Sequence, residues 1–142
     1  MRTKTAMGLA VILLIGANAV KGDDMLQGAW ILKAGEADGK ALTEKQIEEG
    51  KLLIEGDHYR VTLDGGETIT GVQKLDSTSA IKMIDIMDDT GRHKGHMCLG
   101  IYELKGDEFR VAFAPPGKER PTKFVTAPDS GYWAHTWKRI KK

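Results

Sequence analysis

The side chains best suited to chemistry lie close together in RHKGHMC, residues 92–98, which holds two of the four histidines and the only cysteine. Imidazole and thiolate groups are common ligands of zinc and copper. His96 and Cys98 are two residues apart, so they share one face of a predicted strand, while His93 lies in the loop before it. A metal site needs that loop to fold back. If the loop does not fold back, there is no metal site: Cys98 is then a buried thiol, and His93 and His96 are exposed to solvent. We expect no cofactor, and these three residues are the candidate metal ligands.

A second group lies near the C-terminus, where Trp133, His135, Trp137 and Arg139 alternate along one predicted strand. Alternate residues of a strand point to the same face. If that face is interior, a histidine between two indoles is a polar anchor in an apolar ligand pocket. If it is exterior, the same residues form an aromatic surface for a protein or carbohydrate partner. A third interpretation is ordinary cross-strand packing around a satisfied histidine.

Patterns typical of hydrolases are missing from the sequence. Ser77, Ser79 and Ser130 are the only serines, and none lies in a G-x-S-x-G motif. Asp88 and Asp89 are adjacent, so their side chains point apart, and we interpret them as a solvated turn rather than an acid/base pair.

No activated nucleophile or base can be named from these patterns, so we expect a protein that is not an enzyme. The alternative is a hydrolase or metal-dependent enzyme that uses His96, Cys98 or His135.

The proline-rich segment APPGKERP, residues 114–121, contains Gly117 and Lys118 but no complete phosphate-binding loop, and no predicted helix follows it. Its prolines fix backbone angles and interrupt strand pairing, while its charged residues favour solvent. We interpret it as a rigid connection, which leaves open whether it lines a binding site.

Short strands joined by turns must position all of these residues. The one helical candidate is LTEKQIEEGK, residues 42–51, where Thr43 and Gln46 match a capping box. Strands are expected at 25–34, 52–63 (two strands joined at Gly56-Asp57), 68–75, 80–87, 96–104, 108–114 and 132–140, with a weaker one at 122–127. Sequential hairpins with one short helix predict an all-β, up-and-down antiparallel barrel of about eight strands. The register of residues 80–87 stays open, because both of its faces carry apolar groups.

The N-terminus has the three-part pattern of a secretory signal peptide. Two basic residues precede an apolar run too short to span a bilayer comfortably, and A-N-A at 17–19 matches a cleavage site. We expect residues 1–19 to be removed and residues 20–142 to form a single domain in the periplasm or outside the cell, with no membrane attachment after cleavage.

Charge excludes one class of partner for this domain. Without Arg2 and Lys4, the 21 basic side chains become 19, against 20 acidic ones. Nucleic-acid binding needs a clustered basic surplus, so no nucleic-acid partner is expected.

The G-A-W at residues 28–30, together with Arg139 near the end of the last strand, resembles the lipocalins. LQGAW, DGK, LLIEGDHYRVTL, KLD, GIYELKGDEFRVAFAPPGKERPTKF and WKR together resemble an uncharacterised lipocalin-like domain family of planctomycetes and related bacteria. The resemblance covers residues 26–142 and implies a lipocalin-like barrel whose closed end is plugged by Trp30 beneath Arg139. It implies no particular activity.

We therefore expect a small exported binding module, whose barrel holds a small hydrophobic molecule or docks a partner protein. A purely structural interaction domain with a filled core is a further alternative, and the oligomeric state stays open. Pockets combine apolar walls with a few polar anchors, so we expect a ligand site at the end away from Trp30. Its predicted lining residues are Tyr59, Tyr102, Phe113, Trp133 and His135.

Overall fold

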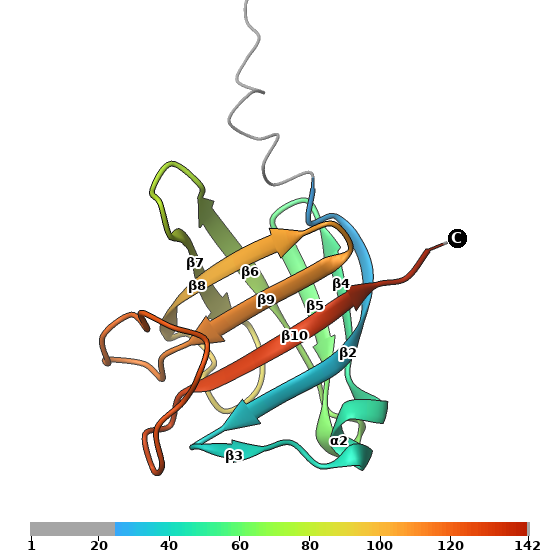
Figure 1. Cartoon of the computed structure of the whole chain (residues 1–142), viewed down its shortest axis with the longest axis horizontal. Helices are drawn as coiled ribbons and strands as arrows, with labels where there is room; N and C mark the ends of the chain where they lie inside the picture. Colours follow the sequence, from blue (N-terminus) through green and yellow to red (C-terminus); the bar gives the residue numbers. More distant parts are fainter. Residues whose placement is uncertain (1–24, 142) are drawn as a thin grey trace, which may run out of the picture.

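The structure, a computed structural model, describes residues 25–141. Eight antiparallel strands form its barrel: β2 (Gly28–Ala37), β4 (Lys51–Glu55), β5 (His58–Thr62), β6 (Thr68–Asp76), β7 (Lys82–Asp88), β8 (Met97–Lys105), β9 (Glu108–Phe113) and β10 (Trp133–Arg139). Each strand pairs with the next, and β10 pairs with β2, which closes the barrel (Figure 1). The prediction of an all-β, lipocalin-like up-and-down barrel is confirmed. A two-residue strand, β3 (Lys40–Ala41), pairs with the end of β2.

Alternation along each strand separates the interior from the surface. In β9, Phe109, Val111 and Phe113 are buried, whereas Glu108 and Arg110 are half-buried on the other face. In β7, the register that the sequence left open places Ile84, Ile86 and Asp88 inside. A strand has a side-chain period of two, so one inward residue fixes the direction of every other one.

The short helix α2 (Glu44–Glu49) has the predicted capping box. The Thr43 hydroxyl accepts from the Gln46 amide at 3.2 Å, and the Gln46 side-chain oxygen accepts from the Thr43 amide at 2.8 Å. Gly50 ends the helix with an ordinary negative φ, so it is not needed for an unusual backbone conformation. A larger residue would not fit, because a Cβ there would lie 2.4 Å from the Leu32 side chain. Within residues 25–141, no helix is long and apolar enough to span a bilayer.

One end of the barrel is plugged by Trp30, which is fully buried. Its indole nitrogen donates to the Leu26 carbonyl at 3.0 Å, and the Arg139 guanidinium lies 4.3 Å from its ring centre. Arg139 also donates to the Gln27 carbonyl at 2.8 Å and lies 3.3 Å from the Asp107 carboxylate. These contacts confirm the predicted cation–π closure of this end.

The connection between β9 and β10, residues 114–132, contains no strand, so the strand expected at 122–127 is wrong. β9 already pairs with β8 and β10, and a closed barrel offers no free edge for a further strand. The connection instead folds over the outside of the barrel, where Phe124 packs on Ile101, Ala112 and Ala134. Arg110 lies 4.4 Å from the Phe124 ring centre, which adds a cation–π contact.

Candidate functional site

The barrel encloses a cavity of about 770 Å³ between the Trp30 plug and the opposite end. Sites for small molecules commonly have volumes of about 300–1,000 Å³. Every barrel strand except β8 contributes to its apolar wall, which is formed by Leu32, Leu52, Ile54, Val61, Ile69, Ile84, Ile86, Phe109, Val111, Phe113 and Trp137. A cavity of this size argues against the alternative of a structural domain with a filled core.

The mouth of the cavity lies at the end of the barrel away from Trp30. Arg139 pairs with Trp30 at one end of the β10–β2 ladder, and Trp133 pairs with Ala37 at the other. The connections before α2, after β5, after β7 and after β9 all contribute lining residues here: Asp38, Leu42, Leu63, Arg92, His93, Pro115 and Gly131. The loop that carries His93, residues 88–95, and the proline-rich segment, residues 114–121, therefore both reach the mouth.

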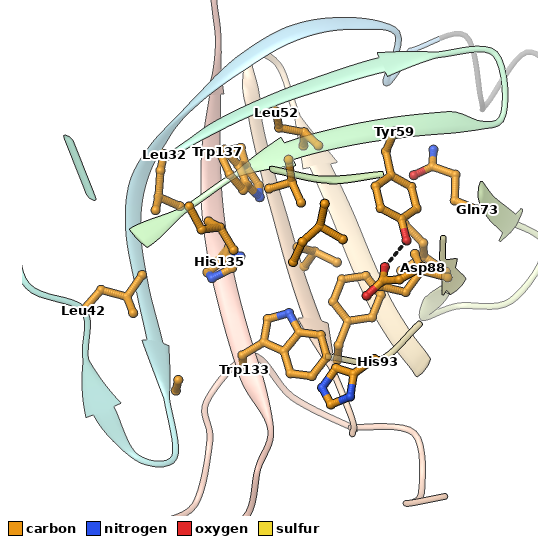
Figure 2. A pocket seen from close by; sticks show the side chains of 18 of the residues that line it. Leu32, Leu42, Leu52, Tyr59, Gln73, Asp88, His93, Trp133, His135 and Trp137 are labelled. Carbon is orange, nitrogen blue, oxygen red and sulfur yellow. Dashed lines mark hydrogen bonds between the residues drawn. The ribbon is translucent and has the colours of Figure 1, made fainter. Parts of the chain in front are cut away.

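The mouth is partly covered by His93, whose loop folds back over the end of β10. Its imidazole stacks on the Trp133 indole, with ring centres 5.8 Å apart and planes 10° apart (Figure 2). Trp133 also contacts Phe113, at 5.5 Å between ring centres. The three rings together form an aromatic wall on this side of the mouth.

Four of the five residues predicted for the ligand site line the cavity, namely Tyr59, Phe113, Trp133 and His135. Trp133, His135 and Trp137 all point inward, which resolves the choice between an interior and an exterior face. Tyr102 also lies inside the barrel but not on the cavity wall. It is 3% exposed and packs edge-on against Phe109, which in turn contacts the Trp30 plug.

Glycines on neighbouring strands make room for the large groups on the wall. Tyr59 of β5 is paired with Gly71 of β6, and Gly71 is paired with Asp88 of β7. A Cβ at Gly71 would lie 2.2 Å from the Tyr59 hydroxyl, so the glycine lets this side chain cross β6 and reach Asp88. Gly35 lies opposite His135 in the same way, and a Cβ there would lie 2.9 Å from the imidazole.

Asp88 is the main residue of the candidate site that the sequence analysis missed. Only 8% of it is exposed, and its carboxylate accepts a hydrogen bond from the Tyr59 hydroxyl inside the cavity (Figure 2). The interpretation of Asp88 and Asp89 as a solvated turn holds for Asp89, which is exposed, and is wrong for Asp88. Parity gives this signal only once the register is known: Asp88 is two residues beyond Ile86 and four beyond Ile84, on the inward face of the same strand.

Burial shifts the protonation of both Asp88 and Tyr59. Desolvation raises the pKa of Asp88, although the hydrogen bond from Tyr59 and the proximity of His93 oppose that rise. Desolvation and the bond to Asp88 raise the pKa of Tyr59 far above its usual value, so the phenol remains a donor at every physiological pH.

His135 is the second ionisable group on the wall. Desolvation lowers its pKa to about 4, so the imidazole is neutral at pH 7. The surface it exposes faces the cavity rather than bulk water. Its ring meets Trp137 edge-on at 5.6 Å between centres, and its ring nitrogens have no hydrogen-bond partner among residues 25–141.

The three candidate metal ligands do not converge. Cys98 is buried, and desolvation and the nearby Asp88 raise its pKa to about 11, which keeps the thiol protonated. His96 is exposed, and His93 is stacked on Trp133. In the part of the chain that the structure describes, no group of three histidine, cysteine or acidic side chains could hold a metal ion.

No protein-family model, curated protein or solved structure matches the chain.

Proposed function

We propose that this chain is a small exported binding module of the lipocalin type, whose barrel holds one small, largely hydrophobic molecule. The observation that carries the proposal is the cavity of about 770 Å³, closed at the Trp30 end and lined by apolar side chains with a few polar ones. Barrels of about eight strands have interiors that side chains either fill or leave open for one small ligand. A partner protein docked on the outside would need no interior space, so the cavity favours the ligand.

Export to the periplasm or the exterior is part of the proposal, and it is supported by the signal-peptide pattern of residues 1–19. Membership of the lipocalin-like family of planctomycetes is likewise proposed, and the barrel with its Trp30–Arg139 plug is compatible with it.

Binding of a neutral fluorescent probe, N-phenyl-1-naphthylamine, tests the proposal directly. The probe brightens in apolar surroundings, so saturable fluorescence at micromolar probe concentrations is expected. Val111→Phe places extra volume on the cavity wall, whereas Val72→Phe makes the same change at an exposed position on the outside of the barrel.

We expect Val111→Phe to weaken probe binding by about tenfold or more, because the added ring occupies space that the probe needs, and tenfold corresponds to about 1.4 kcal/mol of binding free energy. Val72→Phe should leave binding within about twofold of the unmodified chain. Absence of saturable binding to the unmodified chain, or equal effects of the two variants, would contradict a ligand site inside the barrel.

A further inference from the structure

The cavity contains one buried carboxylate, Asp88, held in place from two neighbouring strands. Tyr59 crosses Gly71 to donate to one carboxylate oxygen, which leaves the second oxygen without a hydrogen-bond partner among residues 25–141. No ion pair of the described residues involves Asp88. A carboxylate that is more than nine-tenths buried and has no cationic partner is costly, and a bound cation would remove that cost.

On the basis of the proposed function, we propose that the ligand is an amphipathic organic cation: an ammonium group binds Asp88, and an apolar body lies along the barrel wall.

The neighbours of Asp88 do not supply the missing positive charge. His93 is the basic group that acts on Asp88, and desolvation, together with Arg92, lowers the pKa of His93 although Asp88 opposes this, so burial disfavours the charged imidazole. Arg92 lies at the mouth with an exposed side chain and makes no ion pair with Asp88. The carboxylate is thus open to a cation from outside the chain.

Charge around the cavity favours the same ligand class. Asp38, Glu67 and Asp88 line it, against Arg92 as the one lysine or arginine among the lining residues. Acidic groups in a cleft with low-dielectric walls attract cations and raise their local concentration.

Uncharged groups near Asp88 complement an ammonium ion. Figure 2 shows Gln73 beside Tyr59 and Asp88, and its side-chain oxygen can accept a further hydrogen bond from the ligand. His93 stacks on Trp133 and is near enough to Asp88 to influence its pKa, so aromatic rings lie near the carboxylate. Aromatic rings attract organic cations through the negative potential of their faces.

Three ligands that share one apolar chain and differ only in the head group test the inference: decylamine, decanol and decanoate. Each is titrated at pH 7.5 against the full chain with bound N-phenyl-1-naphthylamine, and the concentration that displaces half of the probe is measured. We expect decylamine to displace the probe at a concentration at least about tenfold lower than decanol, with decanoate weakest, because a charge-assisted bond adds to the shared apolar contact.

Asp88→Asn removes the charge while keeping the size of the side chain and an oxygen that can accept from Tyr59. It should weaken decylamine by about tenfold or more and leave decanol within about twofold. Asp89→Asn is the matched control: it removes an acid one residue away on the exposed side, and it should leave all three ligands unchanged.

The outcomes separate this inference from the proposed function. If decylamine binds no better than decanol, or if Asp88→Asn weakens both equally, the cation inference is overturned while a ligand-binding barrel stands. If neither the probe nor decanol binds at micromolar concentration, the proposed function fails, and this inference fails with it. Should Asp88→Asn not fold, the three ligands on the unmodified chain still decide the question.

Discussion

Asp88 and His135 are the ionisable side chains that the barrel interior perturbs in opposite directions, and both shifts favour the uncharged form. Desolvation raises the pKa of the carboxyl group and lowers that of the imidazole. The two groups differ in what else they contact. Tyr59 donates to Asp88 and stabilises its charge, whereas the His135 ring meets Trp137 edge-on and its nitrogens have no hydrogen-bond partner among residues 25–141. The interior therefore tolerates an anion at one position and excludes a cation at the other.

The pH dependence of stability should report His135. Its pKa is about 4 in the folded chain and about 6.5 when unfolded, so the unfolded chain binds more protons between these values. Stability is therefore complete above pH 6.5 and is lost as the pH falls from 6.5 towards 4, by about 3 kcal/mol in all.

Urea unfolding at pH 7.5, 5.5 and 4.5 measures this loss, and His135→Leu provides the control because it cannot titrate. The raised pKa of Asp88 acts in the opposite sense, since it adds stability on acidification, and it is shared by both proteins. The difference in unfolding free energy between the unmodified chain and His135→Leu therefore reports the titration of His135 alone. If this difference does not change with pH, His135 is not held neutral in the folded chain.

Trp30 should carry a large share of the stability of the plug. Trp30→Ala removes a fully buried indole and its hydrogen bond to Leu26, and we expect a loss of about 3–5 kcal/mol in the free energy of unfolding. Trp133→Ala is the matched truncation at the mouth, where the ring is half-buried and borders space that is already open. It should cost less than half as much. Equal losses, or an unchanged unfolding midpoint for Trp30→Ala, would rule out the plug.

Three neighbouring strands act together to build the polar end of the cavity. The strand register pairs Tyr59 of β5 with Gly71 of β6, and Gly71 with Asp88 of β7. This pairing places the donor Tyr59 and the acceptor Asp88 on either side of a residue that has no side chain. The glycine has ordinary negative φ, and its role is to leave space for the phenol rather than to permit an unusual backbone conformation.

Gly71→Ala should therefore disturb both the fold and the site. A Cβ would lie 2.2 Å from the Tyr59 hydroxyl and 2.4 Å from the Met87 carbonyl, so we expect a loss of about 1–3 kcal/mol in thermal unfolding experiments. Val72→Ala, one residue on and facing outward, is the control and should change stability by less than about 1 kcal/mol. If the Gly71→Ala variant is as stable as the control, Tyr59 does not cross β6 as described.

Local signals in the sequence predicted the elements well, because turns and caps depend on neighbouring residues. The capping box of Thr43 and Gln46 and the hairpin turn at Gly56 are examples. Residues 122–127 show the limit of local signals. Their composition is typical of a strand, but β9 already pairs with β8 and β10, so no strand edge is available to them there. Asp88 shows another limit: its burial depends on a register that the apolar residues on both faces of β7 left undetermined.

The two ends of the barrel differ in how they are built. The Trp30 end is closed by packing, by the Arg139 contacts and by the chain preceding β2. The other end is built from connections and holds the residues of the candidate site. Substitutions at the closed end are therefore expected to change unfolding, and those at the mouth to change ligand affinity, since connections tolerate variation better than the packed strands do.

The proposed export gives a last prediction at this scale. The signal-peptide pattern predicts cleavage after Ala19, so the mature chain begins at Val20. Within residues 25–141, the contacts that close the barrel include the Met25 carbonyl, which accepts from Arg139, and cleavage after Ala19 leaves all of these described contacts in place. A chain that starts at Val20 should therefore match the full chain in unfolding midpoint and in affinity for N-phenyl-1-naphthylamine. Intact mass measurement on protein recovered from the periplasm or the culture medium identifies the first residue. Recovery of a form that retains Met1 would contradict cleavage, and an altered midpoint for the Val20 chain would show that the leader contributes to the fold.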